Sequence, residues 1–93
     1  MIKHIVMWKF KPGTENEQKE FLNGLRSLYG VIPQIRSQEV GENVAQGNYD
    51  AALISIFDSL EDLEIYKTDP RHIEVSSLCR EIRSDRVAVD MEV

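Results

Sequence analysis

Hydrophobic and polar residues alternate along Ile2–Phe10, which predicts a β-strand. The even-numbered residues would share one face of a sheet and the odd-numbered residues the other, because side chains alternate along a strand. Ile5 and Met7 make the odd-numbered face apolar too, so both faces of the sheet are expected to be covered. Since a single layer of helices covers only one face, the second cover is expected to be a partner subunit.

A helix is predicted over residues 15–29. Thr14 is followed three residues later by Glu17, the spacing of a capping box, and Gly30 is placed to end the helix. Residues at helical spacing predict one buried stripe, formed by Phe21, Leu22, Leu25, Leu28 and Tyr29.

The middle of the chain predicts a β-hairpin. A weakly apolar extended segment covers residues 35–40, turn-forming residues follow in 41–48, and a stronger strand runs over Tyr49–Phe57. Residues 51–54 are all apolar, which is typical of a central strand buried on both faces.

Two short helices and a strand are predicted after the hairpin. Ser59 caps a helix over residues 60–67, and Asp69 with Pro70 starts another helix. A final strand over residues 86–93 would place its valines and Met91 on one face. The apolar face predicted for the second of these helices consists of Ile73, Val75, Leu78, Cys79 and Ile82.

The element order β-α-β-β-α-β predicts an α+β, ferredoxin-like fold over residues 1–93 as a single domain. Its four-stranded antiparallel sheet would carry helices on one face only. Two such sheets packed face to face would cover the open face, so a homodimer is expected.

Composition and charge restrict the partners. A net charge of −5 argues against a nucleic-acid binder, which needs a clustered basic surface. No apolar run is long enough to span a membrane and the first residues lack a signal-peptide pattern, so a cytoplasmic protein is expected. Cys79 is the single cysteine and the two histidines are far apart in sequence, so neither a metal site nor another cofactor is expected.

Several segments together resemble one family. They are Met1–Met7, Ile32-Pro33, Glu39–Asn43, Tyr49-Asp50, Phe57, the stretch from Tyr66 through Pro70 to His72, and Val89-Asp90. In this combination and order the chain resembles the Dabb, or stress-responsive α/β-barrel, family. The resemblance implies a homodimer in which two sheets form a barrel-like core.

The family does not imply one function. Its members include plant stress-responsive proteins and a plant polyketide cyclase that performs an intramolecular aldol condensation. In that cyclase a histidine and a tyrosine work in a pocket, and their places match His72 and Tyr66. A neutral imidazole can remove a proton beside a carbonyl, and a phenol can donate a hydrogen bond to the enolate that forms.

The same resemblance implies a pocket for a small apolar or aromatic ligand. His4 matches a pocket-lining histidine and shares its strand face with Val6 and Trp8, while the implied apolar walls are Phe21, Leu25, Leu53 and Val75. Trp8 and Leu25 depart from the cyclase pattern, and the indole would fill part of the pocket. Asp69 replaces the usual histidine before the proline, and a nearby acid would raise the pKa of His72.

Three hypotheses remain open on the sequence alone. The first is a small-ligand-binding protein with cyclase- or lyase-like chemistry at His72 and Tyr66 on a polyketide-like or other carbonyl substrate. The second is a non-catalytic, stress-related structural dimer, because a histidine and a tyrosine at helix ends often only pack. The third is a haem- or quinone-oxidising monooxygenase with His72 as axial ligand. An enclosed cavity that touches His4, Tyr66 and His72 would favour the first.

Overall fold

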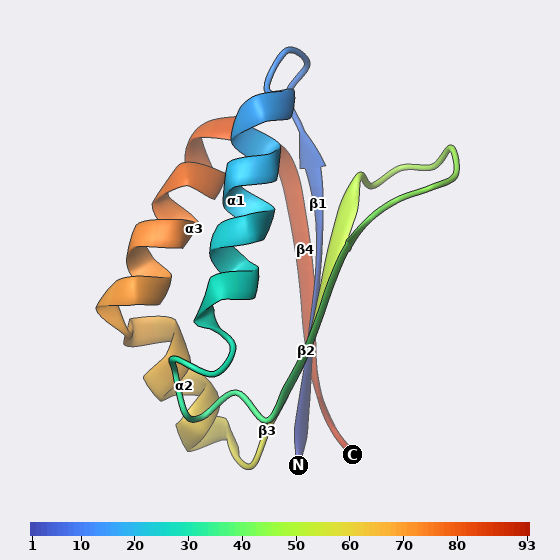
Figure 1. Ribbon diagram of the computed structural model, residues 1–93. Coiled ribbons are helices and arrows are strands. Elements are labelled where there is room, and N and C mark those ends of the chain that lie inside the picture. Colours follow the sequence, from blue (N-terminus) through green and yellow to red (C-terminus); the bar gives the residue numbers. More distant parts are fainter.

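The computed structural model describes all 93 residues, as a four-stranded antiparallel sheet with three helices on one face (Figure 1). The strand order is β2-β3-β1-β4. This is the predicted ferredoxin-like fold, with the second helical segment divided in two. The elements are β1 (Ile2–Phe10), α1 (Glu15–Leu28), β2 (Ser37–Glu42), β3 (Ala51–Phe57), α2 (Leu60–Thr68), α3 (Pro70–Ile82) and β4 (Arg83–Glu92).

Strand β1 lies in the middle of the sheet and alternates as predicted. Its even-numbered residues are buried beneath the helices, where His4 lies between Ser55 of β3 and Asp90 of β4 in the strand register. Trp8 similarly lies beside Arg86. Because paired residues of neighbouring strands point to the same face, β4 turns Arg86 and Asp90 toward the helices.

The opposite face of the sheet carries no helix (Figure 1). Val87, Val89 and Met91 lie on one face of β4, as predicted, and this face is shared with the odd-numbered residues of β1. Val89 is 50% exposed and Met7 is 38% exposed, so an apolar surface faces outward in the single chain. Strand β4 begins at Arg83, three residues before the predicted start at residue 86.

The capping box predicted at Thr14 is wrong. The Thr14 hydroxyl donates to the Lys11 carbonyl at 2.7 Å and makes no cap to the helix amides. The end of α1 is as predicted, because Gly30 follows it with φ of 84°, a conformation that glycine adopts without a Cβ clash. Tyr29 lies beyond the helix and is 51% exposed, so its predicted burial is also wrong.

The break between α2 and α3 is built as predicted. The Ser59 hydroxyl accepts a hydrogen bond from the Asp62 N–H at the start of α2. Asp69 then caps α3 by accepting from the Arg71 N–H at 2.9 Å, and Pro70 takes the first helical position. This break directs the start of α3 back over the sheet.

Helix α3 packs on α1 at a small residue. A Cβ added to Gly24 would lie 3.2 Å from Val75 Cγ1, so the two helices approach closely there. Cys79 and Ile82 are buried as predicted, whereas Ile73 is 48% exposed, so its assignment to the apolar face of α3 is wrong. No helix is both long enough and apolar enough to cross a membrane.

Candidate functional site

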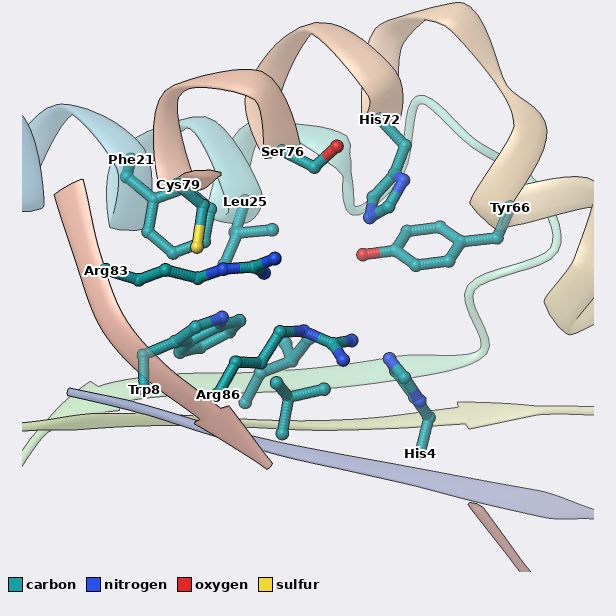
Figure 2. Close-up of a pocket in the computed structure, with 12 residues that line it drawn as sticks. His4, Trp8, Phe21, Leu25, Tyr66, His72, Ser76, Cys79, Arg83 and Arg86 are labelled. Atoms are coloured by element: carbon teal, nitrogen blue, oxygen red, sulfur yellow. The ribbon is translucent and has the colours of Figure 1, made fainter. Parts of the chain in front are cut away.

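A cavity of about 50 Å³ lies between the sheet and the helices (Figure 2). A buried water occupies at least roughly 10–15 Å³ by the same measure, so the space holds about three or four waters or the reacting end of a small ligand. Strands β1 and β3 supply its floor, and α1, α2, α3 and the start of β4 supply the rest. The lining residues are His4, Val6, Trp8, Phe21, Leu25, Leu53, Tyr66, His72, Ser76, Cys79, Arg83 and Arg86.

Tyr66, near the end of α2, presents a hydrogen-bonding group to this cavity that nothing in the chain satisfies. Its side chain is 1% exposed and its hydroxyl has no hydrogen-bond partner, although the hydroxyl points into the space (Figure 2). The ring is held by Phe57, at 5.1 Å between centroids. Burial raises the pKa of Tyr66 well above its usual value, against a smaller lowering by Arg86, so the phenol remains a hydrogen-bond donor at neutral pH.

His72 lies one turn into α3 beside Tyr66. Its Nδ1 is 3.3 Å from the carbonyl oxygen of Lys67, which can only accept, so in the neutral ring this nitrogen carries the proton. The other ring nitrogen faces the cavity (Figure 2). Burial lowers the pKa of His72, and the positive charge of Arg86 adds to that effect. His72 is therefore neutral near pH 7, with a free lone pair toward the cavity.

Asp69 raises the pKa of His72, as predicted for a nearby acid. Burial lowers the pKa more strongly, so the net shift is downward. The carboxylate is engaged instead by the Arg71 side chain and N–H, which lower the pKa of Asp69 to about 2. The replacement of a histidine by Asp69 thus leaves the pKa of His72 below its usual value.

His4 is a second neutral imidazole, oriented by a carboxylate. Its Nδ1 lies 2.5 Å from Asp90 Oδ1, and since a carboxylate only accepts, Nδ1 carries the proton. The side chain is almost completely buried, and this burial lowers the pKa of His4 despite the opposing effect of Asp90. Its second nitrogen points into the cavity (Figure 2). Together with Tyr66 and His72, it places two bases and one acid around a single space.

The structure brings eight of the nine residues anticipated for the site around this cavity: His4, Val6, Trp8, Phe21, Leu25, Leu53, Tyr66 and His72. Val75 lies elsewhere, in a groove between α1 and α3 beside Gly24 and Leu78. Trp8 forms one wall, with its ring edge-to-face against Phe21 at 5.0 Å between centroids, and so narrows the cavity as expected for a bulky indole.

Four lining residues were not anticipated, namely Ser76, Cys79, Arg83 and Arg86. Burial raises the pKa of Cys79, so its thiol remains protonated at neutral pH and is no ready nucleophile. One signal for Arg86 was present in the sequence. Val87, Val89 and Met91 were assigned to one face of the last strand, which puts Arg86 on the opposite face, toward the helices.

A larger recess of about 340 Å³ adjoins the cavity and shares with it His4, His72, Ser76, Arg83 and Arg86. Lys67 and Arg80 also line it. Basic residues make up half of the lining of the recess, whereas the lining of the cavity is mainly apolar.

No group of three or more histidine, cysteine or acidic side chains lies close enough to hold a metal ion. His72 would be the axial ligand of a haem, but a space of about 50 Å³ between Trp8, Phe21 and Tyr66 does not admit a porphyrin. The arrangement fits proton transfer to a small molecule instead.

The fold and this cavity define a ferredoxin-like domain with a cavity between its sheet and its helices, lined by two histidines and a tyrosine. The chain belongs to the Dabb family, described as the stress responsive A/B barrel domain, whose model matches residues 2–93.

The chain is also similar to several known proteins. It is 29% identical over 84 residues to olivetolic acid cyclase of Cannabis sativa, covering 85% of this chain and 83% of that protein. It is 31% identical over 86 residues to an uncharacterized protein of Streptomyces coelicolor, covering 87% of this chain and 89% of the other. A dimeric protein of unknown function and ferredoxin-like fold from Bacteroides fragilis superposes with a TM-score of 0.91 at 32% identity, covering 99% of this chain and 95% of that one.

Proposed function

We propose that this protein binds a small carbonyl compound in the cavity and transfers a proton at the carbon next to the carbonyl group, as in aldol cyclisation or a lyase reaction. The observation that carries the proposal is the Tyr66 hydroxyl, which is buried, has no partner in the chain and faces the same space as two neutral imidazoles. A buried hydroxyl without a partner costs about 1–3 kcal/mol, and a ligand oxygen would supply the missing hydrogen bond.

The chemistry follows from the protonation states. The free nitrogen of His72 accepts the proton from carbon, and the electrons of that C–H bond move onto the carbonyl oxygen as an enolate. Tyr66 donates its hydrogen bond to this oxygen, where the negative charge develops. In a cyclisation the enolate carbon then attacks a second carbonyl group of the same molecule, and the resulting alkoxide takes a proton from the histidine.

His4 has a supporting place in this scheme. Its proton is fixed on the nitrogen that donates to Asp90, so its other nitrogen can accept a hydrogen bond or a proton from the ligand. The paired carboxylate would stabilise the imidazolium that forms if His4 takes the proton. The name of the cyclase relative supports this class of reaction, and the substrate of this chain would differ because Trp8 and Leu25 shape the walls.

We also propose that the protein works as a homodimer through the open face of the sheet. Ile5, Met7 and Val89 leave an apolar surface there that helices do not cover, and the relative from Bacteroides fragilis is described as dimeric. A second sheet packed on this face would remove that surface from water. The helix-side cavity would remain accessible.

A non-catalytic structural dimer is the alternative function. The edge-to-face packing of Trp8 against Phe21 favours it, because these rings leave only about 50 Å³ of space. A reaction test separates the two candidates directly.

The experiment measures exchange of the α-hydrogens of acetone and 2-pentanone for deuterium in D₂O at pH 7.5, by proton NMR. The proposal predicts exchange faster than in buffer, with a loss of roughly 10²–10³-fold in Tyr66→Phe or His72→Gln. Tyr29→Phe is the matched control, since the Tyr29 ring is about half exposed and lies outside the cavity. Exchange no faster than in buffer with both ketones would support the structural alternative.

A further inference from the structure

The recess outside the cavity concentrates positive charge in a protein whose net charge is −5. Lys67, Arg80, Arg83 and Arg86 line it, together with His4, His72, Ile73 and Ser76, and no carboxylate is among the lining residues. Cations gathered in a concave surface raise the local concentration of anions. The recess thus has the electrostatic character of an anion entrance.

Arg83 and Arg86 differ from the other two cations because they line both the recess and the inner cavity. Their guanidinium groups extend toward the space between Tyr66 and His4 (Figure 2). Neither forms an ion pair with a carboxylate within 4.0 Å, whereas Lys67 pairs with Asp90 and Arg71 with Asp69. Their charges are therefore available to a ligand.

The backbone fixes where these two arginines lie. Arg86 is paired with Trp8 in the β1–β4 register, and Arg83 follows directly on the last residue of α3. Both positions are set by regular secondary structure rather than by a loop. The positive charge of Arg86 also reaches the two imidazoles, because Arg86 contributes to the lowered pKa of both His4 and His72.

We propose that Arg83 and Arg86 bind an oxyanionic group of the ligand, a carboxylate or a phosphate, while the uncharged end of the ligand enters the cavity toward Tyr66. Guanidinium groups suit this role because their planar set of N–H donors matches the oxygens of either anion. The identity of the uncharged end as a carbonyl rests on the proposed function. The anion site does not.

The test compares three six-carbon probes by isothermal titration calorimetry at low ionic strength: hexanoate, hexyl phosphate and 1-hexanol. The wild-type protein is expected to bind at least one anion roughly tenfold or more tightly than the alcohol. The stronger of the two anions identifies the natural group. Added salt should weaken the anion and leave the alcohol unchanged, since salt screens charge.

Variants assign the effect to the two arginines. Arg83→Gln with Arg86→Gln is expected to abolish the preference for the anion over hexanol. Arg83→Lys with Arg86→Lys keeps the positive charges without the planar donors and is expected to lose part of the preference for the anion. This second variant also keeps the proposal testable if the glutamine variant does not fold. Arg26→Gln removes one arginine charge at an exposed site on α1 and is expected to leave the preference unchanged.

The proposal is overturned if hexanol binds as well as both anions, if none of the probes binds, or if Arg26→Gln reduces the preference as much as the cavity variants do. The proposed function is judged separately by ketone exchange and by Tyr66→Phe. Anion binding that depends on the arginines, without any ketone exchange, would leave the anion site standing and remove the catalytic proposal.

Discussion

The Tyr66 and His72 rings lie 4.3 Å apart between centroids and are inclined by 47°. Tyr66 lies in the last turn of α2 and His72 in the first turn of α3, and the helix break at Asp69 and Pro70 brings them together. One ring presents a hydroxyl and the other a free nitrogen to the same cavity (Figure 2).

Tyr66→Phe separates the chemical role of Tyr66 from its packing role. The ring and its contact with Phe57 are retained, while a buried hydroxyl without a partner is removed. We therefore expect the free energy of unfolding in urea to equal that of the wild type or to exceed it by about 1 kcal/mol. The variant is also expected to lose ketone exchange. A variant that loses stability by more than 1 kcal/mol would show that the hydroxyl has a structural partner.

The stability of the folded protein is expected to fall as the pH decreases from 7.5 to 5.5. Burial lowers the pKa of both His4 and His72 below about 6.5, the value expected in the unfolded chain. Below pH 6.5 the unfolded state therefore binds more protons than the folded state, which favours unfolding. The stability contribution is fully present above pH 6.5 and is lost toward the lower pKa values of the folded state.

Urea unfolding at several pH values measures this dependence. The double variant His4→Gln, His72→Gln is expected to show a flatter profile over the same range. If the free energy of unfolding of that variant changed with pH as steeply as in the wild type, groups other than the two histidines would cause the pH dependence.

Asp90→Asn tests the role of the carboxylate beside His4. The amide oxygen can still accept from Nδ1, so the ring keeps its orientation, but the negative charge that favours the imidazolium is lost. We expect the pKa of His4 to fall further, and that of His72 to change much less. Proton NMR titration of the two histidine rings measures both values, and an unchanged or higher His4 pKa would contradict this assignment.

Much of the fold follows from the sequence because short-range signals decide it. The alternation along β1 and the Asp69-Pro70 helix start each match the structure. The prediction of a capping box at Thr14 is wrong because the Thr14 hydroxyl donates to the Lys11 carbonyl and does not cap the helix amides. The predicted burial of Tyr29 is wrong because the helix ends one residue before it, and helical spacing alone does not reveal that end.

The site was harder to predict because tertiary contacts determine its properties. The family resemblance pointed to His4, Tyr66 and His72. The sequence could not reveal that the Asp90 carboxylate orients His4 across the sheet, or that the Arg71 side chain donates hydrogen bonds to Asp69. Burial then reversed the pKa shift expected for His72. These effects depend on which groups meet in three dimensions, not on spacing along the chain.

Ile54→Glu is expected to disrupt the proposed dimer. Ile54 lies beside Ile5 on the open face, so a carboxylate there would be buried without a partner in the interface. Light scattering should report a dimer for the wild type and a monomer for the variant. Ile65→Glu, at an exposed position of α2, is the matched control and should remain dimeric. A monomeric wild type would contradict the proposed assembly.

The central claim is that two neutral imidazoles present unprotonated nitrogens to the cavity of Tyr66. Nitrogen-15 NMR of histidine-labelled protein at pH 7.5 tests it most directly, because the nitrogen shifts distinguish the two tautomers and the protonated ring. We predict that both His4 and His72 are neutral with the proton on Nδ1, and that 2-pentanone shifts the Nε2 signals. A protonated ring, a proton on Nε2 of either residue, or unchanged signals with the ketone would contradict this account.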